Sequence, residues 1–314
     1  MVSSRPQRKT CSVFPEAGHK LPSLPVKLVN VTKREKSGHP APAGRAHAGA
    51  QAISDPDDIR ESAEDLLKRH FQDFGQHLKV IGLSAWGTSN MRTGGDDIAQ
   101  ALALIGAQPV WEPSSWRVTG FDIIPLARLG RPRVDVTLRI SGFFRDAFPA
   151  QVDLIDSAAR AVMSLNEPAD MNPAAARYRA DLAAHGADRA GIRVFGAKPG
   201  AYGAGLQALI DERIWSSRAD LGEAYLEWGG YAYGAGATGA RARDMLEARL
   251  AGAEAVIQNQ DNREHDLLDS DDYYQFEGGA AAAIESLRGA APKSYHSDHS
   301  RPERPVIRTL DEEI

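Results

Sequence analysis

Short apolar segments and amphipathic segments of helical period alternate along most of this chain. Short apolar stretches at 80–84, 192–195 and 255–258 are typical of buried strands, and the alternation of apolar and polar residues over 134–140 also predicts a strand. Segments of helical period lie around them, at 57–74, 94–105, 148–162, 206–215 and 240–250. Strands that alternate with helices are typical of an α/β fold. The alternation therefore predicts a layered α/β fold, with a largely parallel sheet flanked by helices and a helix-rich C-terminal part.

The start of the chain differs from the rest in charge and in pattern. Residues 1–50 hold nine Lys or Arg and two Glu, a balance of +7; since the whole chain carries −5, the remaining 264 residues carry −12. No period of 2 or 3.6 is sustained there, which predicts a disordered basic tail over 1–52. A basic tail could contact nucleic acid or an anionic membrane, but we expect neither. The rest divides into two predicted α/β subdomains, 53–168 and 169–314.

Composition excludes several classes of protein. Hydrophobic residues make up 42% of the chain and charged residues 25%, which suits a globular core. No apolar run approaches the roughly 18–20 residues that a membrane span needs. The single cysteine, Cys11, excludes a disulfide framework and a zinc site built from several thiolates. No apolar signal segment follows the basic start, so we expect a cytoplasmic protein.

Each predicted strand runs into a loop of similar character. These loops span 85–95, 141–146, 196–205 and 259–266, and they are rich in Gly, aromatic, Arg, Asn and acidic residues. In parallel α/β sheets, ligands bind outside the carboxyl ends of the strands. Ordinary turns are the alternative, but four loops of one kind favour a polar ligand cleft.

A glycine-rich stretch matches the dinucleotide-binding fingerprint G-x-G-x-x-G. It reads Gly234-Ala-Gly-Ala-Thr-Gly239, and a helix is expected after it at 240–250. The fingerprint also needs a buried strand just before the first glycine, whereas residues 220–228 look helical. A glycine-rich turn is therefore favoured, and a nicotinamide-dependent oxidoreductase is a remote alternative. No G-x-x-x-x-G-K-[ST] motif for ATP occurs in the chain.

The densest group of reactive side chains lies between Asp261 and Glu277. This segment holds seven carboxylates in seventeen residues, with His265 among them. Imidazole and carboxylates could hold a divalent ion transiently or move protons near neutral pH. A solvated loop that caps a helix is the alternative, and residue chemistry leaves both open. A second pair, His296 and His299, is expected in a surface loop.

Four long segments resemble the family of cobaltochelatase (CobN) and magnesium-chelatase large subunits. They begin with Gly82-Leu-Ser-Ala-Trp-Gly-Thr-Ser-Asn-Met-Arg-Thr-Gly-Gly-Asp-Asp and end with Gln258-Asn-Gln-Asp-Asn-Arg-Glu-His-Asp-Leu-Leu-Asp-Ser-Asp-Asp-Tyr-Tyr-Gln-Phe276. Between them lie 130–148, with Ser141-Gly-Phe-Phe-Arg-Asp146, and Pro199-Gly-Ala-Tyr-Gly203. The segments are collinear, and the resemblance covers about residues 57–314.

This resemblance implies a metal-inserting enzyme. It implies ATP-dependent insertion of Co²⁺ into the corrinoid hydrogenobyrinic acid a,c-diamide, during aerobic cobalamin biosynthesis. The large subunit would hold the tetrapyrrole and the Co²⁺ substrate. Two partner subunits would form the ATPase motor and use ATP and Mg²⁺, neither of which this chain would bind. A magnesium-chelatase-like large subunit is a related alternative.

The resemblance also suggests roles for side chains in these loops. Arg92 and Arg145 are candidates to bind the carboxylates of the corrinoid. The ring nitrogens must lose protons as cobalt enters, and His265, Glu264 and Asp261 are the candidate catalytic acceptors. Other expected substrate-binding residues are Trp86, Thr88, Asn90, Tyr202 and Asn259. His265 and Asp266 form a candidate transient metal site.

The chain also departs from the family. Members are several-fold longer, and residues 1–50 resemble nothing in them. The chain is therefore expected to be a C-terminal fragment that does not insert cobalt by itself. A non-catalytic module that binds a tetrapyrrole or a partner remains an alternative from another functional class.

Overall fold

The computed structural model describes residues 56–112, 114–115, 117–234, 236–264, 267–268, 270–301 and 304–314. The predicted tail at 1–52 lies outside the described residues. The strands are β1 (Val80–Ala85), β2 (Ala107–Trp111), β3 (Val118–Ile123), β4 (Asp135–Ile140), β5 (Val194–Gly196), β6 (Tyr231–Gly234), β7 (Ala237–Arg241), β8 (Ala255–Gln260), β9 (Lys293–Asp298) and β10 (Val306–Thr309).

The longer helices are α1 (Pro56–Phe74), α3 (Asp96–Ile105), α6 (Pro149–Met163), α7 (Pro173–Ala190), α9 (Arg218–Gly229), α10 (Arg243–Leu250) and α12 (Gly279–Arg288). Shorter helices are α2 (Gly87–Thr93), α4 (Leu126–Leu129), α5 (Gly142–Ala147), α8 (Gln207–Asp211), α11 (Asp271–Tyr273) and α13 (Leu310–Glu313). A π-helix, η1 (Tyr274–Gly278), joins α11 to α12. No helix in the described part of the chain is long and apolar enough to cross a membrane.

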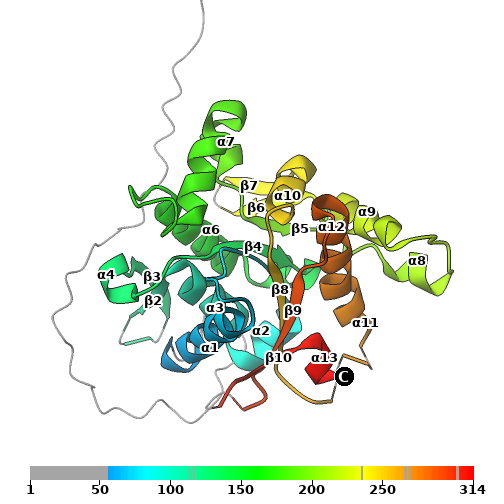
Figure 1. The fold of residues 1–314 in the computed structure, drawn as a ribbon, viewed down its shortest axis with the longest axis horizontal. Helices are drawn as coiled ribbons and strands as arrows, with labels where there is room; N and C mark the ends of the chain where they lie inside the picture. Colours follow the sequence, from blue (N-terminus) through cyan, green and yellow to red (C-terminus); the bar gives the residue numbers. More distant parts are fainter. Residues whose placement is uncertain are drawn as a thin grey trace, which may run out of the picture.

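One eight-stranded sheet runs through the molecule in the order β10-β9-β8-β1-β4-β5-β6-β7 (Figure 1). The strands from β9 to β5 are parallel, whereas β10, β6 and β7 join by antiparallel pairing. The four predicted strands are its centre, β8, β1, β4 and β5. The predicted α/β class is therefore confirmed. A separate hairpin, β2–β3, was not predicted.

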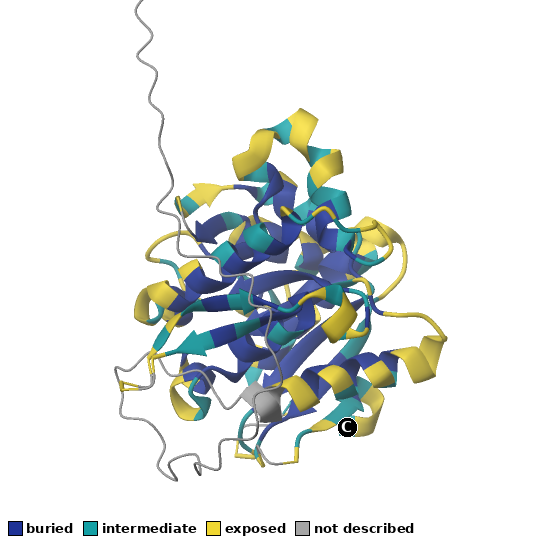
Figure 2. Cartoon of the chain, turned by 90° about the vertical axis from the view of Figure 1, so that its left-hand side faces the viewer, coloured by how far each residue is buried: buried dark blue, intermediate teal, exposed yellow. Residues whose placement is uncertain are grey.

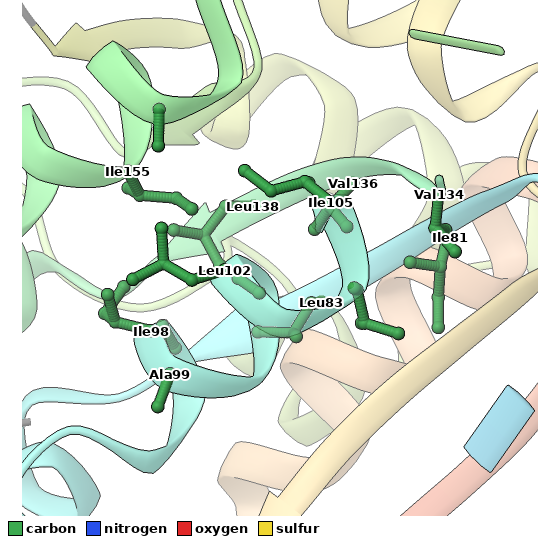
Figure 3. Close-up of a cluster of buried hydrophobic side chains, with 14 of the residues drawn as sticks. Ile81, Leu83, Ile98, Ala99, Leu102, Ile105, Val134, Val136, Leu138 and Ile155 are labelled. Carbon is green, nitrogen blue, oxygen red and sulfur yellow. The ribbon is translucent and has the colours of Figure 1, made fainter. Parts of the chain in front are cut away.

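Helices cover both faces of this sheet. On one face, α1, α3 and α6 pack against the strands, and Figure 3 shows Ile98, Leu102 and Ile105 of α3 lying over Leu83 and Leu138. On the other face, α9, α10 and α12 form a second apolar cluster. Figure 2 shows the central strands buried and the outer sides of the helices exposed. Burial on both faces explains the apolar run of β1, whereas the central strand β4 is buried throughout although Val, Leu and Ile alternate in it with polar residues.

The predicted division into two subdomains at residue 168 stays a prediction. The first layer of helices comes from residues before 168, and the second from residues after it. The sheet itself is continuous across the division, since β1 pairs with β4 on one side and with β8 on the other. The C-terminal part contains helices, as predicted, and also adds β9 and β10 to the sheet.

The glycine-rich stretch forms a hairpin. Gly234 ends β6, and Gly239 lies within the antiparallel partner β7. Both have positive φ angles, +126° and +85°, which glycine adopts readily. The expected helix begins only at Arg243, so the glycines do not open a helix N-terminus. A buried strand does precede Gly234, as the dinucleotide fingerprint requires, but the helix end that would hold the pyrophosphate is missing there, so the structure does not support the nicotinamide interpretation.

Candidate functional site

The loops that follow the parallel strands meet at the carboxyl edge of the sheet. The Gly87 amide, after β1, donates to Ser141 Oγ, after β4, over 3.3 Å. The Tyr202 hydroxyl, after β5, donates to the Asp146 carboxylate over 2.7 Å. Arg92 forms a two-pronged ion pair with Asp261, after β8. These contacts bring together the four loops that the sequence predicts as a cleft.

The Arg92–Asp261 pair joins the first loop to the acidic segment. Arg92 Nη2 donates to Asp261 Oδ1 over 2.9 Å. This hydrogen bonding raises the pKa of the Arg92 guanidinium above its ordinary value. The Arg92 side chain is 45% exposed, whereas Asp261 is 9% exposed. Arg92 thus keeps a solvent-facing side on which an anion can bind, and Asp261 lies behind it.

Arg145 is held inside the protein. Its guanidinium donates to the carbonyls of Lys198 and Ala201 over 2.9 and 3.0 Å and to the Asp146 carboxylate over 2.6 and 2.8 Å. The bond with Asp146 raises the pKa of Arg145. The guanidinium also lies 5.5 Å from the centre of the Tyr202 ring, which is 58% exposed. The Arg145 guanidinium is thus enclosed by these loops and lies against Tyr202, and its predicted role in binding carboxylates stays a prediction.

The remaining predicted substrate-binding residues divide by exposure. Thr88 is exposed on α2, and Trp86 is half-buried, with its ring 5.1 Å from that of Tyr273. Asn90 and Asn259 are buried. Asn259 donates to Asp97 Oδ1 over 2.8 Å, whereas neither side-chain polar atom of Asn90 has a hydrogen-bond partner among the described residues.

The predicted catalytic and metal-binding residues are only partly described. Glu264 is exposed, three residues after Asp261. His265 and Asp266 lie outside the described residues, so their predicted roles stay predictions. Within the described ranges, no group of three or more His, Cys, Asp or Glu is arranged to hold a metal ion.

Sequence reasoning missed a buried polar network beside this edge. Burial raises the pKa of Asp97 to about 7, although Asn259 and the Trp86 amide both donate hydrogen bonds to it. The neighbouring Asp96 accepts a 3.0 Å hydrogen bond from His299 Nδ1. Asp96 and Asp97 are the first two residues of α3. The sequence alone therefore indicates only the acidic start of a helix.

The two C-terminal histidines were also misjudged. We expected a surface loop, but His296 lies in β9 and His299 directly follows it, and both are buried. His299 Nε2 lies within hydrogen-bond distance of Ser62 and Ser297. His296 Nε2 lies 3.1 Å from Glu277 Oε1. The expectation was wrong because the strand pairing of β9 with β8 and β10 brings this segment into the sheet.

A groove of about 570 Å³ adjoins the edge. The acidic segment contributes Leu267, Leu268, Tyr273, Tyr274 and Glu277 to its lining. Helices α9, α12 and α13 supply further apolar walls. Tyr273 connects the groove to the edge, because it contacts Trp86 and lies close enough to Arg92 to interact with its charge.

Comparison with known proteins gives this edge a family context. A model of the family CobN/Magnesium Chelatase matches residues 58–314. The aerobic cobaltochelatase subunit CobN of a Sinorhizobium species is 65% identical over 264 residues, which are 81% of this chain and 21% of that protein. The corresponding subunit of Pseudomonas aeruginosa is 59% identical over 263 residues, with the same coverage.

A solved structure agrees. The catalytic subunit of cobaltochelatase from Mycobacterium tuberculosis superposes with a TM-score of 0.82 at 47% identity, over 85% of this chain and 23% of that one. The chain thus spans about a fifth of the length of these relatives. Long collinear identity together with a shared fold leads to one conclusion: the chain belongs to the CobN/magnesium chelatase family.

Proposed function

We propose that this chain is part of the tetrapyrrole-binding large subunit of a cytoplasmic, ATP-dependent cobaltochelatase. The whole enzyme would insert Co²⁺ into hydrogenobyrinic acid a,c-diamide during aerobic cobalamin biosynthesis. The observation that carries this proposal is the 65% identity to a cobaltochelatase subunit across residues that form the sheet and its ligand edge. Two partner subunits would supply the ATPase motor, with ATP and Mg²⁺, since the sequence has no P-loop motif.

The exposed groups of the edge suit a polycarboxylate ring. Arg92 presents a guanidinium, Tyr202 presents an aromatic face, and Thr88 presents a hydroxyl. Carboxylates of a corrinoid pair well with a guanidinium, and its ring stacks on an aromatic side chain. Three less accessible side chains would hold these loops in place beneath the ring: Arg145, Asn90 and Asn259. Half-buried Trp86 would lie at the border of the ring.

Cobalt insertion also requires proton removal. A ring nitrogen gives up its proton when the cation takes its lone pair, so an acceptor must lie near the ring. Asp261, Glu264 and His265 are proposed acceptors in the acidic segment, and His265 with Asp266 would hand over the Co²⁺ substrate. Of these residues, Asp261 contacts Arg92 directly.

Ring binding by the purified chain tests this proposal. We expect Arg92→Ala to weaken binding of metal-free hydrogenobyrinic acid a,c-diamide by roughly 10-fold or more, because a charge-assisted hydrogen bond contributes about 1.5–3 kcal/mol. Absorbance titration measures the dissociation constant. Arg128→Ala, on exposed α4 away from the edge, is the matched control and should bind as the parent does. Equal affinity of all three proteins would contradict the proposal.

A non-catalytic tetrapyrrole- or partner-binding module is the second candidate. It is favoured by one observation, that the chain spans about a fifth of its relatives. A chelatase assay with the two motor subunits and ATP separates the candidates. Ring binding without cobalt insertion, which we expect for this chain alone, supports the module, and insertion supports the enzyme.

A further inference from the structure

Three large apolar side chains are exposed in neighbouring loops at the carboxyl edge of the sheet. Met91 of α2, Phe143 of α5 and Tyr202 of the loop after β5 are 53%, 38% and 58% exposed. Single exposed apolar residues are normal, but a group of them on one surface indicates a binding site. The contacts of these three residues show that they form one surface, the apolar platform.

Phe143 packs against helix α2, next to Met91. A Cβ atom at Gly87 would lie 2.5 Å from Phe143 Cδ1 and 2.9 Å from Phe143 Cγ, so the phenyl ring lies directly over this glycine. Gly87 and Met91 are four residues apart in α2 and therefore lie on the same side of that helix. The Phe143 ring and the Met91 side chain are thus neighbours on the surface.

Tyr202 packs against the residue before Phe143. A Cβ atom at Gly142 would lie 2.7 Å from Tyr202 Cδ1 and 3.1 Å from Tyr202 Cγ. The Tyr202 hydroxyl donates to Asp146, and its backbone carbonyl accepts a 3.1 Å hydrogen bond from Trp228 Nε1. The Tyr202 ring is therefore held in place although it is exposed, so little side-chain freedom is lost when a ligand binds on it.

The strand order sets the length of the apolar platform. Met91, Phe143 and Tyr202 follow β1, β4 and β5, which are consecutive strands of the sheet. Adjacent strands lie about 4.8 Å apart, so the three loops extend over roughly 10 Å. That length is comparable with the width of a tetrapyrrole macrocycle.

Polar groups border the platform on the side of β8. Thr88 and Arg92 are four residues apart in α2, and both are exposed beside Met91. The two-pronged ion pair with Asp261, which follows β8, holds the Arg92 guanidinium in place. Since β8 and β4 flank β1 on opposite sides, this charge lies at one end of the platform. The surface as a whole therefore suits a ligand with a flat apolar face and an anionic rim.

We propose that Met91, Phe143 and Tyr202 contact one apolar face of the tetrapyrrole, while Arg92 binds a carboxylate at its rim. The inference rests on the proposed function and adds Met91 and Phe143 to the residues that contact the ring. Aromatic contacts and the burial of apolar surface supply affinity that does not depend on charge. The apolar platform therefore selects a flat macrocycle, and Arg92 selects its acidic substituents.

Ring binding at low and high salt tests this proposal without requiring turnover. Phe143→Ala should weaken binding of metal-free hydrogenobyrinic acid a,c-diamide by about fivefold or more, because one aromatic contact is lost. This loss should be the same at about 0.05 and 0.5 M NaCl, whereas the loss caused by Arg92→Ala should shrink, since salt screens charges. Absorbance titration measures both. Phe74→Ala is the matched control, because Phe74 is exposed near the start of β1, at the opposite edge of the sheet, and the variant should bind as the parent does.

Methyl NMR reports the contact directly, which a merely structural role of these residues would not do. In the chain labelled with carbon-13 at its methionine methyl groups, the Met91 signal should shift when the ring is added, and Met91→Leu identifies that signal. The Met245 methyl is buried in the second apolar cluster and should not shift. If Phe143→Ala does not fold, Met91→Gln replaces it in the titrations and should weaken ring binding by about threefold, since less apolar surface is buried.

Each outcome has a defined meaning. Equal ring affinity of the parent and Phe143→Ala, or Met91→Gln where that variant is used, overturns the inference while leaving the proposed function intact. An unshifted Met91 signal at saturating ring does the same, and it is the result expected if this surface binds a partner subunit instead. Failure of the parent chain to bind the ring counts against the proposed function and overturns the inference with it. A salt-independent loss of affinity together with a shifted Met91 signal supports both.

Discussion

At Asp97, burial changes the acid–base behaviour of a single carboxyl group. Its folded-state pKa of about 7 lies above the ordinary value near 4, so the folded chain binds more protons than the unfolded chain between those two pH values. Stability must therefore fall as pH rises from about 4 to 7. The cause is desolvation, which two hydrogen bonds to the carboxylate only partly offset.

We expect Asp97→Asn to remove this pH dependence. The amide can accept the Trp86 N–H bond, and the Asn259 amide can flip so that its unpartnered oxygen accepts from the new side chain. The free energy of unfolding of the variant relative to the parent should rise by up to about 1.4 kcal/mol per pH unit between pH 5 and 7, and then level off. Urea unfolding at several pH values measures it.

A surface carboxylate provides the control. Asp153→Asn, on the exposed side of α6, should follow the pH dependence of the parent. A relative stability of Asp97→Asn that does not change across this range would show that Asp97 ionises normally in the folded chain.

Helices α9 and α12 pack closely at Gly222, a glycine within α9. A Cβ atom there would lie 2.8–2.9 Å from the Ala282 carbonyl group and 2.9 Å from Ala283 Cα. Since these are backbone atoms, the helices would have to separate. Gly222→Ala should therefore destabilise the chain by about 1–3 kcal/mol, despite the higher helix propensity of alanine. Thermal or denaturant unfolding measures the loss.

Gly278 is the matched position, because it is also helical but has space around it. A Cβ atom there would meet only Tyr274 Cβ, at 3.8 Å. Gly278→Ala should be neutral or slightly stabilising. If both substitutions have the same effect, helix propensity rather than helix–helix contact determines the result.

Across the whole molecule, a buried ion pair links the two halves of the sequence. Asp135 begins β4, and Arg193 directly precedes β5. The Arg193 guanidinium donates to both carboxylate oxygens over 2.5 and 3.1 Å, and both side chains are buried. Asp135→Asn should cost about 3–5 kcal/mol of unfolding free energy, because it leaves the Arg193 charge buried without its counter-ion.

The Arg189–Asp244 pair is the exposed counterpart. Its side chains are 41% and 58% exposed, so Asp244→Asn should cost less than about 1 kcal/mol. Urea unfolding of both variants at one pH measures the two losses of unfolding free energy. Similar costs for the buried and exposed pairs would show that burial does not govern the Asp135–Arg193 interaction.

The sequence by itself determined the elements whose pattern is local. The short apolar runs of β1, β5 and β8, the alternating pattern of β4 and the amphipathic period of α3 are each visible within a few residues, so the sequence predicts these elements without the structure. The four loops could be placed at one edge because parallel strands all end there. The family motifs lie in these same loops.

Only the tertiary structure decided which side chains meet. His296 comes from a polar strand, Lys-Ser-Tyr-His-Ser-Asp, that has no apolar signal of its own and becomes buried only because β8 and β10 pair with it. Its contact with Glu277, the enclosure of Arg145 by carbonyls and the burial of Asp97 all join residues far apart in sequence. No local period records such contacts, because burial and partner choice arise when separate elements pack.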